Sequence, residues 1–306
     1  MRLLFAGTPR VAVPSLDALV SSRHEVVAVL TRPDTVAGRG RQPTRSPVAE
    51  RADTLGIPVW TFSPRDPELL QGLIDARIEC CPVVAYGALI PPDVLDVPAH
   101  GWINLHFSLL PAWRGAAPVQ HALLQGDAIT GATTFRLDAG LDTGPRLAFV
   151  DEPIKPRDTS GDLLDRLAHR GADLLLATID GLAAGTLEGI PQVDGGATYA
   201  PKIEVDDARV SWSDSADAID RLVRACTPAP GAWTTFRGER VKLGPITPVD
   251  LLGLAPGEVR AAKSDVLVGT ATTAVALGQV VAQGKRAMAA ADWARGVRTG
   301  DGEVFV

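Results

Sequence analysis

An amide and an imidazole lie two residues apart in a segment whose other side chains are apolar. Ile103, Leu105 and Phe107 alternate with Asn104 and His106, and this period of two indicates a strand. We expect the apolar face to be buried. The amide and the imidazole then share the opposite face, about 7 Å apart at Cα, because a strand rises about 3.3 Å per residue. An amide donor beside an imidazole can stabilise a developing negative charge and move a proton.

A second segment, residues 137–145, could bring a carboxylate to this pair. Gly140 and Gly144 permit backbone conformations that other residues avoid, which indicates a loop shaped around something. Asp142 could orient the imidazole of His106 and favour its charged form, or it could bond the backbone of its own turn. We interpret Asn104, His106 and Asp142 as a catalytic group. A structural histidine and a turn-forming asparagine are the alternative.

The strand pattern ends at Ser108, Leu109, Leu110 and Pro111, because proline cannot donate to a sheet ladder. Polar groups at the end of a buried strand, followed by a loop, lie where open α/β sheets bind their ligands. We therefore expect a binding site at this edge of the sheet.

Strand and helix patterns alternate through the first half of the chain. Strands are expected near 2–6, 25–31, 57–60, 80–86, 102–107 and 129–137, with helices near 12–21, 47–56, 66–76 and 115–125. Strands separated by helix-length segments predict βαβ units and a mostly parallel, Rossmann-like sheet. No Gly-x-Gly-x-x-Gly follows the first strand, and the chain contains no P-loop. These absences argue against nicotinamide and nucleoside-triphosphate chemistry.

The sequence pattern changes from alternating strands and helices to short strands after a long helix predicted over residues 159–184. A Gly- and Pro-containing stretch follows, and then short β-prone segments at 232–237, 240–243, 265–269, 273–277 and 279–282, preceded by a helix near 215–225. Closely spaced short strands favour a small barrel, such as an OB-type fold. We predict a catalytic domain over 1–186, a linker over 187–206, and an OB-like domain over 207–306.

Composition places the chain among soluble globular proteins. Of its 306 residues, 46% are apolar and 22% are charged, and the apolar stretches are too short to span a membrane. The apolar run at the start is too short for a signal peptide, so we expect a cytoplasmic location. Cys80, Cys81 and Cys226 form neither a disulfide framework nor a zinc pattern.

Charge is distributed unevenly on a chain whose net charge is −6. Residues 1–206 carry 18 Lys+Arg against 25 Asp+Glu, a balance of −7, whereas residues 207–306 carry 12 against 11, a balance of +1. Residues 31–46 contain four arginines (Arg32, Arg39, Arg41 and Arg45) and one acid, Asp34. A basic loop on an acidic body can steer a polyanion, and a solvated surface loop is the alternative.

Several motifs together resemble one known family over nearly the whole chain. They are Asn-Leu-His at 104–106 with Ser-Leu-Leu-Pro at 108–111, Trp-Arg-Gly-Ala-Ala-Pro at 113–118, Leu-Asp-Thr-Gly at 141–144, Phe-Ala-Gly-Thr-Pro at 5–9, Val-Ala-Tyr-Gly at 84–87, the loop at 33–40, and Gly-Lys-Arg-Ala-Met at 284–288. This combination resembles the 10-formyltetrahydrofolate-dependent transformylase family, and within it the branch that formylates methionyl-tRNA. Phe107 and the pair Cys81-Pro82 depart modestly from the family pattern.

The resemblance implies a reaction and its participants. A formyl group would move from 10-formyltetrahydrofolate to the α-amine of methionyl-initiator tRNA, for translation initiation, without a metal ion. The resemblance assigns catalysis to Asn104, His106 and Asp142, and folate binding to Ser108, Leu109, Leu110 and Pro111. It also assigns tRNA contacts to Arg39, Arg41, Arg45 and Lys202, and we expect a monomer.

Two other classes of function compete with this interpretation. The first is another folate-dependent formyl transferase or hydrolase that acts on a ribonucleotide, a sugar amine or water. The basic loop and the second domain argue against it. The second is a tRNA-binding protein without enzymatic activity, which would have no use for Asn104, His106 and Asp142 together.

Overall fold

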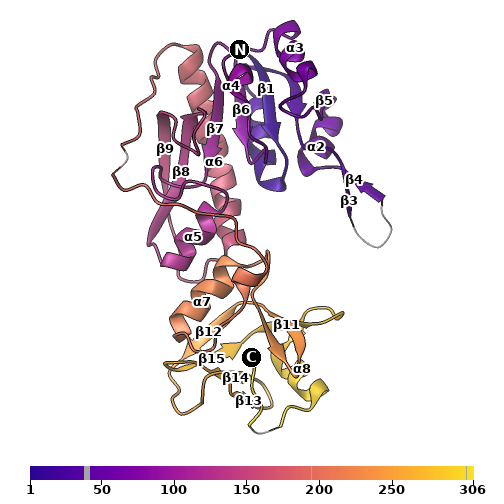
Figure 1. Ribbon diagram of the computed structural model, residues 1–306, viewed down its shortest axis with the longest axis vertical. Helices are drawn as coiled ribbons and strands as arrows, with labels where there is room; N and C mark the ends of the chain where they lie inside the picture. Colours follow the sequence, from indigo (N-terminus) through magenta and orange to yellow (C-terminus); the bar gives the residue numbers. More distant parts are fainter. Residues whose placement is uncertain (38–41, 194, 301) are drawn as a thin grey trace. The chain divides into compact units, whose positions relative to one another are not determined.

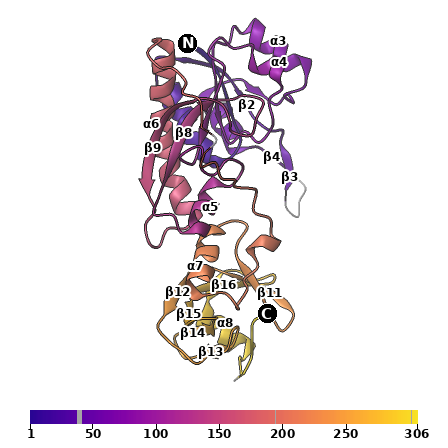
Figure 2. The ribbon, with the colours of Figure 1, turned by 60° about the vertical axis from the view of Figure 1, so that its left-hand side comes forward.

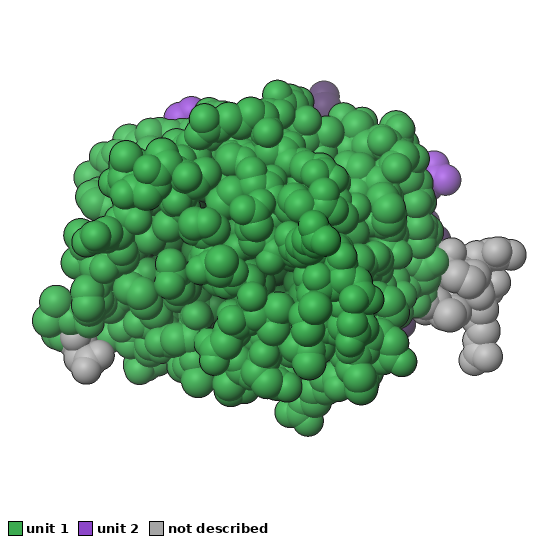
Figure 3. All heavy atoms as spheres, turned by 90° about the horizontal axis from the view of Figure 1, so that it is seen from above, with its two compact units in different colours: residues 1–115, 129–153, 164–199 green, residues 116–128, 154–163, 200–306 purple. Residues whose placement is uncertain are grey.

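The computed structural model describes residues 1–306 except for 38–41, 194 and 301 (Figure 1). Two compact units share the chain, and Figure 3 colours them separately. Unit 1 contains residues 1–115, 129–153 and 164–199, and unit 2 contains residues 116–128, 154–163 and 200–306. Packing therefore brings three separate stretches of sequence into each unit. The domain boundaries expected at 186 and 207 stay a prediction.

Unit 1 is built on a seven-stranded sheet with the order β5-β2-β1-β6-β7-β8-β9. Its strands are β1 (Arg2–Gly7), β2 (Glu25–Leu30), β5 (Val59–Trp60), β6 (Cys81–Val84), β7 (Trp102–His106), β8 (Ile129–Arg136) and β9 (Arg146–Pro153). Neighbours from β5 to β7 pair in parallel, and β8 and β9 continue the sheet antiparallel. The predicted α/β class with a mostly parallel sheet is confirmed.

The predicted helices follow the strands in the expected order, and the short helix α4 is an addition that the sequence patterns did not predict. The helices are η1 (Arg10–Ala12), α1 (Val13–Val20), α2 (Pro47–Leu55), α3 (Pro67–Asp75), α4 (Pro92–Leu95) and α6 (Ser160–Ala183). Proline opens three of them, since the missing N–H is not needed in a first helical turn. The same rule explains why α5 (Pro118–Gln125) begins three residues later than expected. A small hairpin, β3 (Thr35–Ala37) and β4 (Gln42–Thr44), occupies the basic loop.

Helix α6 covers one face of β7 and β8, and Figures 1 and 2 both show it along this end of the sheet. A Cβ on Gly171 would lie 2.8 Å from the Leu105 side chain, so the helix approaches β7 closely at a residue without a side chain. The hydroxyls of Thr134 and Thr178 add a hydrogen bond of 2.8 Å between β8 and α6. Because Leu105 faces α6, its strand neighbours Asn104 and His106 face the opposite side of the sheet.

The cysteines of unit 1 lie in the core of the sheet. Cys80 and Cys81 are free thiols with no exposed surface. Burial raises the pKa of the Cys80 thiol to about 12 and that of Cys81 well above its usual value. Both thiols therefore stay protonated and pack as core residues of the sheet.

Unit 2 is a small domain of antiparallel strands. One sheet has the order β10-β11-β16-β17 and another the order β12-β15-β14-β13. The elements are η2 (Asp206–Ala208), α7 (Ala216–Ala225), β10 (Trp233–Phe236), β11 (Glu239–Leu243), β12 (Ile246–Val249), β13 (Val259–Ala261), β14 (Val266–Gly269), β15 (Ala274–Leu277), β16 (Gln279–Ala282), β17 (Met288–Ala289) and α8 (Ala290–Val297). The predicted small β domain is present, with β12, β13, β17 and α8 as elements the sequence patterns did not reveal.

Candidate active site

His106 is the last residue of β7. Its ring is almost wholly buried, and each of its two nitrogens faces a different group. The residue is 6% exposed. Its Nε2 lies 2.8 Å from the carbonyl oxygen of Trp113. Because a carbonyl can only accept, Nε2 carries the hydrogen. Nδ1 lies 3.8 Å from Oδ2 of Asp142, so in the neutral ring it presents a lone pair on the side of that carboxylate.

Burial and charge act on the His106 ring in opposite directions. Desolvation is the largest effect and lowers the pKa of His106 below its usual 6.5, while the Asp142 charge and the Trp113 carbonyl raise it. Burial prevails because a charged ring loses its hydration in this packed environment. His106 is therefore a neutral imidazole at neutral pH, and Nδ1 is the atom that can accept a proton.

Asp142 is held towards His106 rather than towards its own turn. Its Oδ2 accepts a hydrogen bond of 2.8 Å from the backbone N–H of Gly115, and its backbone has a left-handed φ of 54°. Asp138 performs the turn role instead, because its Oδ1 accepts from Gly140 N at 3.0 Å and from Thr143 Oγ1 at 2.7 Å. Of the two roles that the sequence left open for Asp142, the structure thus favours the one in which its charge faces the imidazole and favours the protonated ring.

Asn104 lies two residues before His106 on the same face of β7. Its strand partners are Val83 of β6 and Phe135 of β8, so neighbours on both sides fix its backbone. The residue is half-buried, and its side-chain amide makes no hydrogen bond to any residue that the structure describes. Asn104 thus offers two N–H donors to a ligand. The structure places the predicted amide and imidazole on one strand face and brings the carboxylate to the imidazole.

The Ser108–Pro111 loop after β7 is held by hydrogen bonds from its own backbone and from β8 and β9. Ser108 is fully buried, and its hydroxyl donates to the carbonyl of Ala112 at 2.6 Å. Thr133 Oγ1 donates to the Ser108 carbonyl at 2.7 Å and accepts from Leu110 N at 3.2 Å. Arg146 Nη1 donates to the Leu110 carbonyl at 2.8 Å. The Ser108 side chain therefore shapes the loop from within, and its assignment to folate binding stays a prediction.

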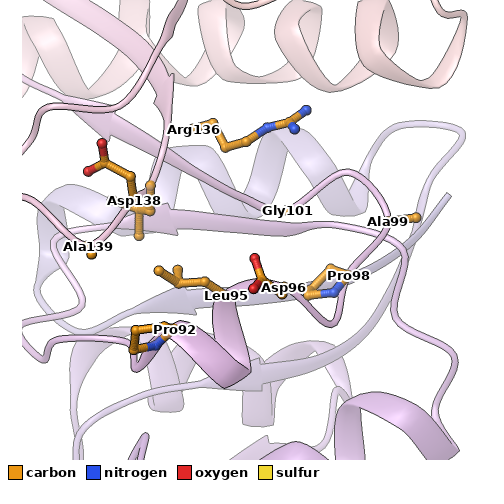
Figure 4. Close-up of a pocket in the computed structure, with 10 residues that line it drawn as sticks. Pro92, Leu95, Asp96, Pro98, Ala99, Gly101, Arg136, Asp138 and Ala139 are labelled. Atoms are coloured by element: carbon orange, nitrogen blue, oxygen red, sulfur yellow. The ribbon is translucent and has the colours of Figure 1, made fainter.

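A pocket of about 410 Å³ lies beside the loop that carries Asp142. Figure 4 shows Arg136 and Asp138 on one side and Pro92, Leu95 and Asp96 on the other. Its walls combine apolar side chains with two carboxylates and one guanidinium. The lining residues are Pro92, Leu95, Asp96, Pro98, Ala99, Gly101, Arg136, Leu137, Asp138 and Ala139.

The four cations assigned to tRNA by resemblance differ in what the structure says of them. Arg39 and Arg41 lie outside the described residues. Arg45 makes two hydrogen bonds to Asp53, at 2.7 and 2.9 Å, and its guanidinium lies 3.7 Å from Asp34. Lys202 lies 2.8 Å from Glu204. Arg45 and Lys202 are thus already paired with carboxylates, and their tRNA contacts stay predictions.

Two other arginines, in unit 2, were missed by the sequence analysis. Arg240 lies with its guanidinium carbon 3.9 Å from the ring centroid of Trp233, and that of Arg209 lies 5.5 Å from the same centroid. Both arginines are exposed, and neither has a carboxylate partner among the described residues. Arg209 and Arg240 are 31 residues apart in the sequence and meet only through packing on Trp233, so no local motif could have revealed them.

The described part of the chain shows no sign of two other classes of site. No group of three or more His, Cys, Asp or Glu side chains there is arranged to hold a metal ion. Within the same residues, no helix combines the length and apolar character that a membrane span requires.

Comparison with known proteins gives the family. A family model described as "Formyl transferase" matches residues 1–179, and one described as "Formyl transferase, C-terminal domain" matches residues 202–298. The methionyl-tRNA formyltransferase of Thermobifida fusca is 62% identical over 100% of this chain and 99% of its own. That of Streptomyces coelicolor is 62% identical over 99% of each chain.

Solved structures share the fold at much lower identity. HypX from Aquifex aeolicus, in a complex with tetrahydrofolic acid, gives a TM-score of 0.70 at 19% identity and covers 98% of this chain and 48% of its own. Phosphoribosylglycinamide formyltransferase from Bacillus halodurans gives 0.52 at 25% identity, over 60% of this chain and 96% of its own. From the family models and the full-length relatives, this chain belongs to the formyl transferases and, among them, to the methionyl-tRNA formyltransferase family.

Proposed function

We propose that this chain transfers a formyl group from 10-formyltetrahydrofolate to the α-amino group of methionyl-initiator tRNA, the step that prepares this tRNA for translation initiation. The observation that carries the proposal is the geometry of the site: His106 Nδ1 lies 3.8 Å from the Asp142 carboxylate, and the Asn104 amide, which no described residue binds, lies on the same strand face. Full-length relatives at 62% identity support the choice of substrate.

Asn104 stabilises the charge that develops on the formyl oxygen. When an amine attacks a formyl carbon, the carbonyl oxygen becomes negative, and a donor already aimed at it lowers the barrier. The Asn104 amide is suited to this because no described residue occupies its N–H groups. It also carries no charge of its own that would have to be desolvated.

His106 moves the proton that the reaction must transfer. The attacking amine loses one proton as its bond to the formyl carbon forms, and the departing N10 gains one as its bond breaks. Nδ1 of the neutral ring accepts the first proton, and the Asp142 carboxylate stabilises the resulting imidazolium. The same Nδ1–H then donates to N10, which returns His106 to its starting state.

We propose that the folate donor binds beside the 137–145 loop, which also carries Asp142. The pocket lined by α4 and residues 137–139 offers apolar surface for a pterin ring, and the carboxylate of Asp138 and backbone groups can read polar ring edges. The Ser108–Pro111 loop would form a further boundary of the folate site through its backbone. Its shape is fixed by Thr133 and Arg146 before any ligand arrives.

The tRNA contacts of the proposal come from two sources. Resemblance supplies Arg39, Arg41, Arg45 and Lys202, of which the two described ones are ion-paired. Packing supplies Arg209 and Arg240, whose charges have no carboxylate partner among the described residues. We further propose that catalysis needs no metal ion and that the chain acts in the cytoplasm as a monomer.

The test compares acceptors and removes the proposed oxyanion donor. Purified protein with 10-formyltetrahydrofolate should formylate methionyl-initiator tRNA and leave glycinamide ribonucleotide and sugar amines unreacted. Asn104→Ala should lower kcat by about 10²–10³-fold, as loss of one oxyanion donor does elsewhere, with an unchanged circular dichroism spectrum. Transfer to a ribonucleotide in preference to tRNA would favour the rival transferase class, and wild-type turnover by the variant would remove Asn104 from the mechanism.

A further inference from the structure

We propose that Gln192 is a positioning residue for the transfer reaction, because its side chain joins the buried guanidinium of Arg114 to the backbone of the loop that presents Asp142. The inference rests on the proposed function, since it explains how the carboxylate beside His106 is held. Gln192 follows α6, in a stretch that the sequence analysis treated only as a linker.

The hydrogen bonds of Gln192 fix which way its amide faces. Its Oε1 accepts from Arg114 Nη2 at 2.8 Å and from Nε at 3.3 Å. Its Nε2 donates to the carbonyls of Asp142 and Gly144, each at 2.8 Å. A guanidinium can only donate and a carbonyl can only accept. With the amide flipped, its NH2 would face the Arg114 guanidinium and its oxygen would face two carbonyl oxygens, so the orientation is fixed. Every side-chain position of the amide is thus matched to a complementary group.

Arg114 strengthens this arrangement through its burial. The residue is 3% exposed, and none of the described carboxylates forms an ion pair with it. Its positive charge therefore acts mainly on the Gln192 carbonyl, in a charge-assisted hydrogen bond. Polarisation of the amide in turn makes its N–H groups stronger donors to the Asp142 loop. The buried Arg114 thus helps to orient the Gln192 amide.

The loop needs such a restraint because Asp142 has a backbone conformation that L-residues avoid. Its φ of 54° costs free energy and persists only where surrounding contacts hold it. Gly115 N–H fixes the carboxylate end, and Gln192 fixes the backbone end. Without the second restraint, the carboxylate can follow a relaxing backbone away from Nδ1 of His106.

The segment that carries Gln192 is itself attached to both catalytic loops. Ile190 exchanges backbone hydrogen bonds of 2.7 and 2.8 Å with Arg146, where the Asp142 loop rejoins the sheet. On the other side, Thr198 accepts from Arg114 N and, through its hydroxyl, from Trp113 N, both at 2.8 Å. Gln192 thus lies between two anchors.

Two substitutions of Gln192 separate its role as an acceptor for Arg114 from its role as a donor to the Asp142 loop. Gln192→Met removes both, whereas Gln192→Glu retains an acceptor for Arg114 and replaces the donor by an oxygen facing two carbonyls. Each should lower kcat about 10- to 100-fold, the cost of a small misplacement of a catalytic group, with the KM for tRNA and for folate unchanged. Gln71→Met is the matched control, because Gln71 makes one exposed hydrogen bond of 2.8 Å to Asp75, within α3.

A spectroscopic readout distinguishes positioning from a general structural role. His106 faces the Asp142 carboxylate, the Trp113 carbonyl and the edge-on ring of Phe135. Loss of the aligned carboxylate removes a charge that raises the pKa of His106, so its NMR titration should shift to lower pH in Gln192→Met. Asp142→Asn should shift it in the same direction and serves as the positive control.

The outcomes separate this inference from the proposed function. Absence of formyl transfer by the wild-type protein overturns the function itself. If the wild type is active and Asp142→Asn is impaired, wild-type kcat in the Gln192 variants overturns the inference alone. A loss of kcat in Gln192→Met with the wild-type His106 titration also overturns it, and if this variant does not fold, the kcat of Gln192→Glu decides.

Discussion

At His106, a single ring combines the two properties that a proton-transfer group needs. The Trp113 carbonyl fixes the hydrogen on Nε2, and burial keeps the ring neutral, so that Nδ1 is left as a base. The Asp142 charge raises the pKa of His106, but by less than burial lowers it. The Asp142 carboxylate can therefore stabilise the imidazolium when the ring takes up a proton. The 3.8 Å separation of Nδ1 and Oδ2 is consistent with this. A hydrogen bond between these two atoms requires the protonated ring.

Burial of a neutral His106 predicts how stability depends on pH. Because its pKa in the folded chain is below 6.5, the unfolded chain binds more protons in acid. The contribution to the free energy of unfolding is fully present above pH 6.5 and is lost as the pH falls through the native pKa. His106→Gln should therefore reduce the decline in stability below pH 6.5, measured by urea unfolding at several pH values. His24, whose pKa burial also lowers, remains in the variant, so part of the decline persists; an unaltered decline would contradict the assignment.

At the level of elements, the sequence predicted what local periodicity encodes. The alternation in β7 and the helical patterns of α1, α2, α3 and α6 were recognisable, because each reflects contacts within a few residues. Strand β9 was not recognisable, because it is an edge strand in which buried and exposed residues do not alternate regularly. Its apolar residue Phe149, for example, is 67% exposed. The strands of the hairpin β3–β4 have three residues each, and the buried face of helix α8 consists of Trp293 and three alanines, so neither gave a clear local pattern.

The chemistry of the site was likewise predicted in part. Residue types and spacing identified Asn104, His106 and Asp142, because functional groups are visible in a sequence. Backbone groups are not, so the Gly115 N–H and the Trp113 carbonyl that hold Asp142 and His106 could be found only in the structure.

The loop between β8 and β9 depends on the missing side chain of Gly144. A Cβ there would lie 1.8 Å from the carbonyl oxygen of Arg136, a backbone atom that cannot move away cheaply. Gly144→Ala should therefore destabilise the protein by about 1–3 kcal/mol or more, as overpacking does, and lower kcat by displacing Asp142. Gly195→Ala is the control, since nothing lies within 4 Å of its added Cβ, and should change stability by less than about 0.5 kcal/mol. Equal melting temperatures for both variants would show that the loop can close without glycine.

At the scale of the whole molecule, the chain carries a net negative charge, as does the tRNA proposed as its partner. A protein of net charge −6 repels a polyanion on average, so binding must come from local groups of cations whose charge is not already neutralised. Arg45 and Lys202 each have a carboxylate within 2.8 Å, and a phosphate must compete with it. Arg209 and Arg240 face no such competition among the described residues, and Trp233 holds both guanidiniums in place.

Salt dependence tests whether these two arginines contact phosphates. Each lost phosphate contact reduces the slope of log KM for tRNA against log salt by about one, because fewer counterions are released on binding. Arg209→Gln and Arg240→Gln should each produce this reduction and leave the KM for 10-formyltetrahydrofolate unchanged. Arg237→Gln is the matched control, since Arg237 is exposed in the turn between β10 and β11 but lies 2.6 Å from Glu303. If all three variants keep the wild-type slope, the pair on Trp233 is a solvated surface feature. If Arg237→Gln lowers the slope as much as the other two, pairing with a carboxylate does not determine which cations reach the RNA.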